Sequence, residues 1–441
     1  MITKSKQLEA NLINLLEQCY DKVNRFSPDW LLKLRQEGAT NFEKLGVPST
    51  RNEEWKYTNL KGLAEHTFEL AEPSTINDEV IKSHINQIVE GPKIVISNGR
   101  FDENLSTGYE NIPGITICSL AEAIELKKEA VEPHLGQIAK IEEQSFASMN
   151  TALFEDGLFI HCEKSAELAD PIQVLYMSTN DIGTPTANNP RNLIIMEQNS
   201  RVNFIETYAS TEDQATFSNC VTEIVIRQDA HLEHTKIQCE SEKAYHIAHI
   251  ELHQEQKSNY VSNNLTFGGL LVRNDHNVWL GGEHIECTLD GVYVGNQEQV
   301  IDNHTKLDHA FPNCNSYQIY KGILNDKAAG VFNGKIFVHQ DAQKTDAKQT
   351  NQALLLSKTA TIDTKPQLEI FADDVKCTHG ATIGQLEQDA LFYLKSRGIP
   401  QEQAQSILVY AFASEVIEKV SCEPIKNDLE NLLYNKLRSN F

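Results

Sequence analysis

The feature that most constrains this 441-residue chain is a long run, from Leu153 to about Cys377, in which hydrophobic and polar residues alternate with a period of two. Side chains of a β-strand point alternately to opposite faces, so the alternation predicts a succession of short strands. Helical stretches of about 10–15 residues are absent from the run, which argues against a sheet of βαβ units. Clear alternation occurs at 158–161, 172–176, 192–196, 202–206, 221–226, 236–240, 285–290 and 335–339. The pattern fits a sandwich, a barrel or a β-solenoid, and the lack of a crisp motif repeat leaves these three open.

The segment before this run has mainly helical periodicity. Hydrophobic residues recur at helical spacing between about Gln7 and Gly91, and a further helix is predicted from Ala121 to Lys128. A short β-like stretch, Lys93–Ser97, precedes Asn98-Gly99, which is a typical hairpin turn. The N-terminal part is therefore predicted to be mostly helical.

The tail after Thr382 is predicted to be helical as well. One helix ends at Arg397, with Gly398 just beyond it, a usual C-terminal signature. The next helix is apolar nearly all round from Ile407 to Val420, so we expect it to pack in a bundle or against a partner. A last helix runs from about 424 to 438. The predicted domains are a mostly helical one over 1–150, a β core over 151–377 and a C-terminal helical domain over 378–441.

Composition limits the classes of function. A formal net charge of −23 argues against nucleic acid or an anionic membrane as the main partner. The longest apolar run, Ile407–Ala413, is too short to span a bilayer, and the N-terminus leads into an amphipathic segment, so we expect a cytoplasmic protein. Walker A, G-x-S-x-G and H-E-x-x-H motifs are absent. If ATP is used, a partner must hydrolyse it.

The nine cysteines are scattered and never form a C-x-x-C pair, which excludes a disulfide framework, a zinc ribbon and a ferredoxin-type cluster cradle. Any metal site must be assembled from distant positions or between subunits. Cys377 and His379 are two apart in a segment that reads as extended, so their side chains would share a face. A thiolate beside a neutral imidazole can bind iron, an iron–sulfur cluster, zinc or copper. The alternative is an inward core cysteine beside a structural histidine at the end of a strand.

Other candidate sites are weaker. The histidine pairs His231/His234, His246/His249 and His304/His309 have odd spacing, which puts the members of each pair on opposite faces of a strand and prevents chelation of one metal. A solenoid can also be a carbohydrate-active enzyme, which needs clustered carboxylates. The candidates for that role are Asp302, Asp308, Asp341 and Asp346.

Ordered motifs along nearly the whole chain resemble the SufB/SufD family, the scaffold subunits of the SUF system of iron–sulfur cluster assembly. The motifs are Gly46-Val47-Pro48; Arg51, Glu54 and Trp55-Lys56-Tyr57-Thr58; Asp302-Asn303-His304-Thr305; His309; Ser316 and Tyr320-Lys321-Gly322-Ile323; 331–336; 342–347; 351–357; 365–370; 372–382; and 391–399. SufB-like members carry a cluster-building cysteine at the position of Ala353, and Glu-His-Glu-Ala-Thr where this chain has Thr378-His379-Gly380-Ala381-Thr382. Both departures indicate the SufD-like branch.

The resemblance implies a mainly β fold, a right-handed parallel β-helix flanked by N-terminal and C-terminal α-helical domains. It implies a scaffold subunit without catalytic activity, paired through its β-helix with a SufB-like paralogue. An ABC-type ATPase of the SufC type would bind the C-terminal helices, for which the candidate residues are Leu391, Tyr393, Arg397, Ile407, Leu408 and Phe412.

The same resemblance implies a transient iron–sulfur cluster at the interface of the heterodimer. His379 would face the cysteine of the paralogue as an iron ligand, with Cys377 as its neighbour, and the isolated chain would hold no cofactor. Alone, the chain is expected to form a homodimer, because its partner-facing surface would be uncovered. An alternative hypothesis is a purely structural scaffold that positions its two partners and supplies no ligand.

Overall fold

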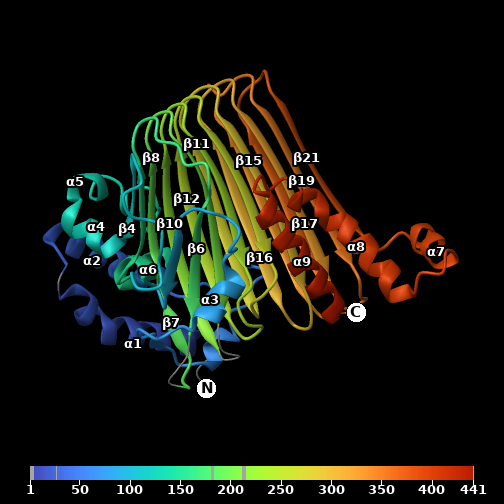
Figure 1. Ribbon diagram of the computed structural model, residues 1–441, viewed down its shortest axis with the longest axis horizontal. Helices are drawn as coiled ribbons and strands as arrows, with labels where there is room; N and C mark the ends of the chain where they lie inside the picture. The colour runs from blue at the N-terminus through green and yellow to red at the C-terminus, as the bar shows by residue number, and fades with distance from the viewer. Residues whose placement is uncertain (1–3, 26, 180–182, 211–214, 441) are drawn as a thin grey trace.

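The computed structural model describes residues 4–25, 27–179, 183–210 and 215–440. Its core is a parallel β-solenoid of about seven turns, and from β8 (Arg191–Met196) onward successive strands alternate between two sheets and each strand pairs with the strand two places along the chain. Figure 1 shows the strands side by side as one long wall. The fold prediction is confirmed, and the solenoid replaces the sandwich and barrel alternatives.

The sheets are named A and B here. Sheet A contains β4 (Ile115–Ser119), β5 (Gly157–Cys162), β8 (Arg191–Met196), β10 (Thr216–Ile226), β12 (Tyr245–Gln254), β14 (Leu271–Leu280), β16 (Val300–His309), β18 (Ala329–Val338) and β20 (Thr361–Ile370), with β1 (Glu69–Leu70) and β7 (Thr186–Asn188) at its side. Sheet B contains β3 (Arg100–Phe101), β2 (Lys93–Ser97), β6 (Ile172–Ser178), β9 (Arg201–Ser210), β11 (His231–Gln238), β13 (Asn259–Thr266), β15 (Glu286–Gly295), β17 (Asn315–Leu324), β19 (Asp346–Leu355) and β21 (Lys376–Gly384).

The length of a solenoid turn varies. Arg273 is in register with Asp302, 29 residues later, whereas Gln318 is in register with Gln349, 31 residues later. A repeat of changing length gives no crisp sequence motif, which is why the alternation alone did not distinguish a solenoid from a sandwich.

Stacked aliphatic side chains fill part of the space between the sheets. One such row contains Ile224, Leu252, Val278, Leu307 and Ile336, which are in register on five successive strands of sheet A and are all buried. Burying each such side chain contributes about 1.5–3 kcal/mol, so these rows hold successive turns together.

Another part of the interior is polar. Lys236 and Gln238 of β11 are buried between the sheets, while Ile237 points outward and packs in the cluster that includes the C-terminal helices. Ordinary alternation would have put the isoleucine in the core and the lysine in water. Both faces of sheet B are covered at this point of β11, so polarity does not tell which face is inside.

The N-terminal helices lie at one end of the solenoid (Figure 1). They are α1 (Lys4–Asn24), α2 (Asp29–Leu45), α3 (Asp78–His84), α4 (Leu120–Leu126), α5 (Lys128–Val131) and α6 (Ser145–Leu153). Two short 3₁₀ helices follow α2, at Glu53–Trp55 and Leu63–Glu65, and the first lies further along sheet A, where Glu54 contacts Arg273 and His304. The predicted hairpin is confirmed, because β2 and β3 pair antiparallel around Asn98 and Gly99, both with positive φ.

The C-terminal helices are α7 (Gln388–Ser396), α8 (Gln401–Ile417) and α9 (Glu423–Asn440). Helix α8 packs through Val409 and Ala413 against the outer face of sheet B, and α7 projects away from the solenoid (Figure 1). The end of α7 is confirmed: Gly398 has a φ of 86° and donates its N–H to the Lys395 carbonyl. Among the described helices, none has the length and apolar character needed to cross a membrane.

Candidate functional site

Cys377 and His379 lie on β21, the last strand of sheet B. This strand continues to Gly384, across the predicted domain limit between 377 and 378. It pairs with β19 on one side, and no described strand pairs with its other side. The two residues are therefore at the open end of the solenoid, at a sheet edge with unpaired backbone groups.

The Cys377 side chain continues a row of interior residues. It is in register with Ala347 of β19, which follows Ser316 and Cys287 on the preceding strands, and it packs against the main core cluster. Burial raises the pKa of its thiol above the ordinary value. A half-buried thiol with a raised pKa is a poor thiolate donor until a metal displaces its proton. The geometry thus places Cys377 as a cap on the core with its sulfur close to the open end.

The His379 side chain differs from its neighbour in exposure. It is in register with Gln349 of β19, so both side chains lie on the interior-facing side of sheet B, yet His379 is exposed because no further turn covers it. Among the described residues, no hydrogen-bond or ion-pair partner of its ring is present. A neutral imidazole in this setting has a lone pair available to a ligand that arrives from outside.

The last strand of sheet A presents a different edge. β20 contains Pro366, which has no N–H to donate, and the neighbouring Lys365, and both residue types discourage pairing at an exposed edge. β21 also has a lysine, Lys376, at its first position, but it contains no proline. Of the two strands at the open end, the one that carries His379 is the better template for another strand.

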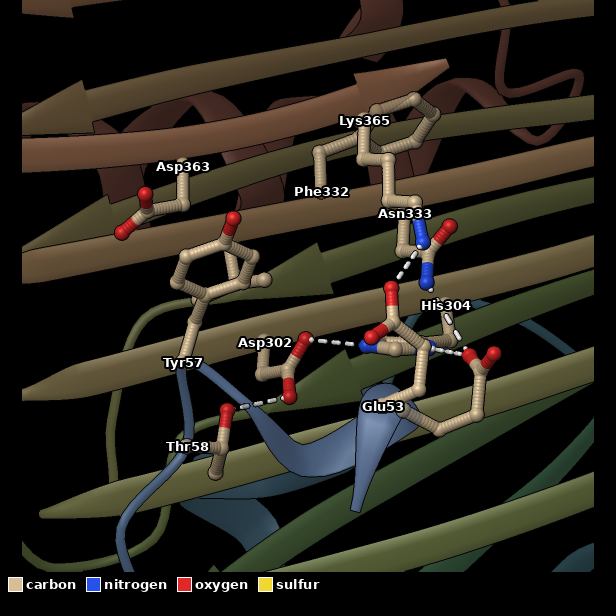
Figure 2. A pocket seen from close by; sticks show the side chains of 11 residues that line it. Glu53, Tyr57, Thr58, Asp302, His304, Phe332, Asn333, Asp363 and Lys365 are labelled. Atoms are coloured by element: carbon tan, nitrogen blue, oxygen red, sulfur yellow. Dashed lines mark hydrogen bonds and ion pairs between the residues drawn. The ribbon is translucent and has the colours of Figure 1, made fainter. Parts of the chain in front are cut away.

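A second group of polar residues surrounds a pocket on the outer face of sheet A. Figure 2 shows that the 3₁₀ helix Glu53–Trp55 and the residues after it lie over β16, β18 and β20. The pocket is lined by Glu53, Glu54, Tyr57, Thr58, Asp302, His304, Val331, Phe332, Asn333, Asp363 and Lys365. Four of the family-like motifs that are far apart in the sequence meet here. From its residues alone, the Arg51–Thr58 segment was expected to be a docked loop rather than a ligand site, and in the structure it is docked on sheet A.

His304 is the centre of this group. Its Nε2 is 3.0 Å from Asp302 Oδ1 and its Nδ1 is 3.3 Å from Glu54 Oε2. Burial alone would lower the pKa of His304, but the charge of Asp302 and the hydrogen bonds that the ring donates to both carboxylates raise it to about 9. The same contact lowers the pKa of Glu54. His304 is therefore an imidazolium at neutral pH, with both ring nitrogens occupied.

Arg273 completes the attachment of the N-terminal segment. Its Nη1 donates to Asp302 Oδ2 at 2.9 Å and to the Glu54 carbonyl at 2.7 Å, and its guanidinium stacks 3.9 Å above the centre of the Trp55 ring. Thr58 donates its hydroxyl to Asp302, and Lys365 Nζ donates to Glu53 at 2.6 Å (Figure 2). We call the ion-pair group of Glu54, Arg273, Asp302 and His304 the His304 clamp.

The His304 clamp has the chemistry of a joint between two parts of the chain. A protonated histidine cannot be a metal ligand, and the carboxylates are already neutralised by Arg273 and His304. Within the part of the chain that the structure describes, no group of three or more His, Cys, Asp or Glu side chains could hold a metal ion. The clamp fixes the N-terminal segment to the solenoid wall.

The carboxylates proposed for a carbohydrate-active site do not gather. Asp302 belongs to the clamp, and Asp308 pairs with His339 at 2.8 Å. Asp341 is in the turn after β18, and Asp346 begins β19 in the other sheet. Their separation removes the observation on which that alternative depended.

The residues predicted to bind an ATPase fall into two sets. Leu391 is buried where α7 meets α8, and Leu408 and Phe412 are half-buried. Tyr393, Arg397 and Ile407 are exposed, as is the neighbouring Phe392, which is 73% exposed and which sequence reasoning did not select. The exposed set marks a surface of α7 and α8 that the chain itself leaves uncovered.

Sequence reasoning also missed a buried polar network between the sheets. Glu206 Oε1 is 3.0 Å from His234 Nε2, whose Nδ1 is 2.9 Å from the Tyr260 hydroxyl. Lys236 Nζ lies 2.9 Å from His246 Nε2 and donates to Asn274 at 2.6 Å. The available signal was the polar residues at both even and odd positions of the strands, which are unusual unless one set is internally paired.

The fold and these sites define a parallel β-solenoid protein with helical additions from both ends of its chain. Family models match two adjacent regions: "SufBD protein N-terminal region" over residues 6–174, and "SUF system FeS cluster assembly, SufBD core domain" over residues 176–412. The chain belongs to the SufBD family of the SUF system of iron–sulfur cluster assembly.

Three relatives illustrate the similarity. The iron–sulfur cluster assembly protein SufD of Escherichia coli is 31% identical over 391 residues, which cover 88% of each chain. An iron–sulfur cluster assembly SufBD family protein of Synechocystis is 31% identical over 431 residues, 96% of this chain and 94% of the relative. The SufD protein of Bacillus subtilis is 26% identical over 424 residues, 93% and 95% of the two chains.

Proposed function

We propose that this chain is the SufD-like scaffold subunit of an iron–sulfur cluster assembly complex and that His379 supplies a ligand to a nascent cluster shared with a SufB-like paralogue. The observation that carries the proposal is the placement of His379. It is an exposed imidazole without a partner among the described residues, on the free edge of the last strand of the solenoid. A second chain that pairs with β21 would bring its own ligands to the same point.

A shared site of this kind suits a scaffold. Four thiolates from one chain would hold a cluster tightly, whereas an imidazole from one subunit and a thiolate from another form a weaker site across a joint that can open. Cys377 is a second candidate ligand, although its place in the core makes it the less accessible donor. The cluster is cargo, and the isolated chain is proposed to be free of cofactor and of catalytic turnover.

The exposed surface of α7 and α8 supports the proposed contact with an ABC-type ATPase. Tyr393, Arg397 and Ile407 join Phe392 there, whereas Leu391, Leu408 and Phe412 support the helices from within. Large exposed side chains close to one another are typical of a protein interface. The open end of the solenoid would likewise allow a homodimer when the paralogue is absent.

The test is anaerobic loading of the co-expressed three-component complex. We expect His379→Ala to leave the complex intact on co-purification but to reduce its iron content and visible absorbance. Thr378→Ala is the matched control, because Thr378 is exposed on the same strand and points to the opposite face. Normal loading of the His379→Ala complex would instead support the purely structural scaffold.

A further inference from the structure

We propose that Gln349 is a positioning residue for His379: its side-chain oxygen accepts one ring N–H of His379 and so leaves the other ring nitrogen bare toward the free edge. This inference rests on the proposed role of His379. It comes from the interior of the solenoid, where a row of amide side chains ends directly behind the histidine.

The row begins at Thr305 of β16 in sheet A. Gln318 of β17 donates from Nε2 to Thr305 Oγ1 at 2.6 Å, and Gln349 of β19 donates from Nε2 to Gln318 Oε1 at 2.8 Å. Gln318, Gln349 and His379 are in register on three successive strands of sheet B. Each amide thus donates toward the preceding turn and presents its oxygen toward the open end.

The last oxygen of the row has no partner. Gln349 is only 1% exposed, and its Oε1 is buried without a hydrogen bond among the described residues. A buried carbonyl oxygen without a hydrogen bond loses its hydration without compensation, so a donor at this position is favoured. Hydrogen bonds in a row also polarise one another, which makes the terminal oxygen a better acceptor.

His379 occupies the next registered position of the row, and because the structure shows no hydrogen bond between its ring and Gln349, the proposed bond requires a change of side-chain rotamer. Neighbouring strands are about 4.8 Å apart, and the two side chains project from registered positions on the same face. The His379 ring has no competing partner in the part of the chain that the structure describes. Histidines that bind metals commonly donate their second N–H to a carbonyl or carboxylate, which fixes the tautomer and the ring orientation.

Gly334 on the facing strand β18 holds the Gln349 amide in place. A Cβ at this position would collide with Gln349 Nε2 and would lie 2.9 Å from its Cδ. The backbone of Gly334 does not have positive φ, so the close approach to the amide is the reason that a side chain does not fit. A methyl group there should displace the amide without removing it.

The tautomer of His379 tests the proposal in the isolated full chain, labelled with ¹⁵N-histidine and assigned by the signals lost in His379→Ala. At a pH where the ring is neutral, we expect one protonated and one bare nitrogen. Gln349→Met keeps the length of the side chain but removes the oxygen, and the two nitrogen shifts should move toward the average of a freely exchanging ring. Gln349→Glu should retain the fixed tautomer, and Gln352→Met, on the outward face of the same strand, should not change it.

Gly334→Ala provides a second route to the same effect if Gln349→Met is poorly folded. If the Gln349 amide had the opposite orientation, its Nε2 would donate to His379 and occupy the lone pair of a ring nitrogen. In that case the Gln349→Glu variant would change the tautomer, which would overturn the proposal. An unchanged tautomer in both Gln349→Met and Gly334→Ala would overturn it as well.

Cluster loading separates this inference from the proposed function. In the three-component complex, Gln349→Met should weaken iron binding by about 10- to 100-fold, the usual effect of losing the partner of a metal-bound histidine, and Gln349→Glu should restore it. If His379→Ala loads normally, the proposed function fails whatever the tautomer. If His379→Ala abolishes loading while Gln349→Met leaves tautomer and loading unchanged, only the positioning role fails.

Discussion

Removing the charge of His304 should destabilise the protein in a pH-dependent way. His304 is 11% exposed at its side chain and sits between Asp302 and Glu54, which raise its pKa to about 9 from the ordinary 6.5. The folded protein therefore holds a proton that the unfolded chain releases above pH 6.5. We expect His304→Gln to lose the stability that comes from this proton.

The sign and the size follow from linkage. Because the folded-state pKa is the higher one, the stabilisation is fully present below pH 6.5 and is lost as the pH rises through about 9. One pKa unit corresponds to about 1.4 kcal/mol, so the shift of His304 corresponds to about 3 kcal/mol. Between these two pH values, the stability difference between wild type and His304→Gln should shrink by about that amount.

Urea unfolding followed by tryptophan fluorescence is the assay, since Trp55 stacks on Arg273 inside the clamp and reports its opening. The free energy of unfolding is measured for both proteins at several pH values between 6 and 9.5. In the difference between the two proteins, the contributions of the titratable groups that they share cancel. His284→Asn is the control, because His284 is an exposed turn residue with positive φ, which asparagine tolerates. A wild-type-minus-His304→Gln difference that does not change with pH would refute the assignment of the raised pKa to the clamp.

Three further predictions concern other parts of the molecule. The buried guanidinium of Arg191 lies 2.5 Å from a carboxylate oxygen of Glu223, and Glu223→Gln removes that counter-charge. Urea unfolding should show that the free energy of unfolding falls by about 3–5 kcal/mol, and a fall below about 1 kcal/mol would contradict the pairing. Lys321→Met removes the Nζ that donates to the Phe412 carbonyl at 2.9 Å, so backbone amide hydrogen exchange in α8 should become faster while the solenoid strands stay protected. Unchanged exchange in α8 would show that this hydrogen bond does not hold α8 on the solenoid. Phe392→Ser should change stability by less than about 0.5 kcal/mol but reduce capture of the ABC-type ATPase, and full capture would place the ATPase contact elsewhere.

The strands could be predicted from the sequence because the pattern that indicates each strand lies within a few neighbouring residues. The alternation at 158–161 and 335–339 corresponds to β5 and the end of β18, and Asn98-Gly99 forms the predicted hairpin. The end of α7 at Gly398 also depends only on neighbours in the chain. Such features follow from side-chain periodicity and turn chemistry, which a single sequence contains.

The register between turns could not be predicted in the same way. Glu54 and His304 are far apart in the sequence, and their contact depends on which residues of successive turns stack and on where the N-terminal segment crosses sheet A. Turn lengths of 29 and 31 residues conceal that register. The position of Gln349 behind His379 was hidden for the same reason, although the sequence did indicate that Cys377 and His379 share a face.

The hydrogen bonding of interior-facing histidines changes along the solenoid. In the middle turns, His234 has partners at both ring nitrogens, from Glu206 and Tyr260. Closer to the open end, His309 bonds through Nε2 to Ser316 and leaves Nδ1 buried without a partner. At the last strand, among the described residues, the ring of His379 has none. His379 is exposed, so its ring, unlike the two buried rings, has free hydrogen-bonding capacity, which the proposed contacts with Gln349 and with a ligand would use.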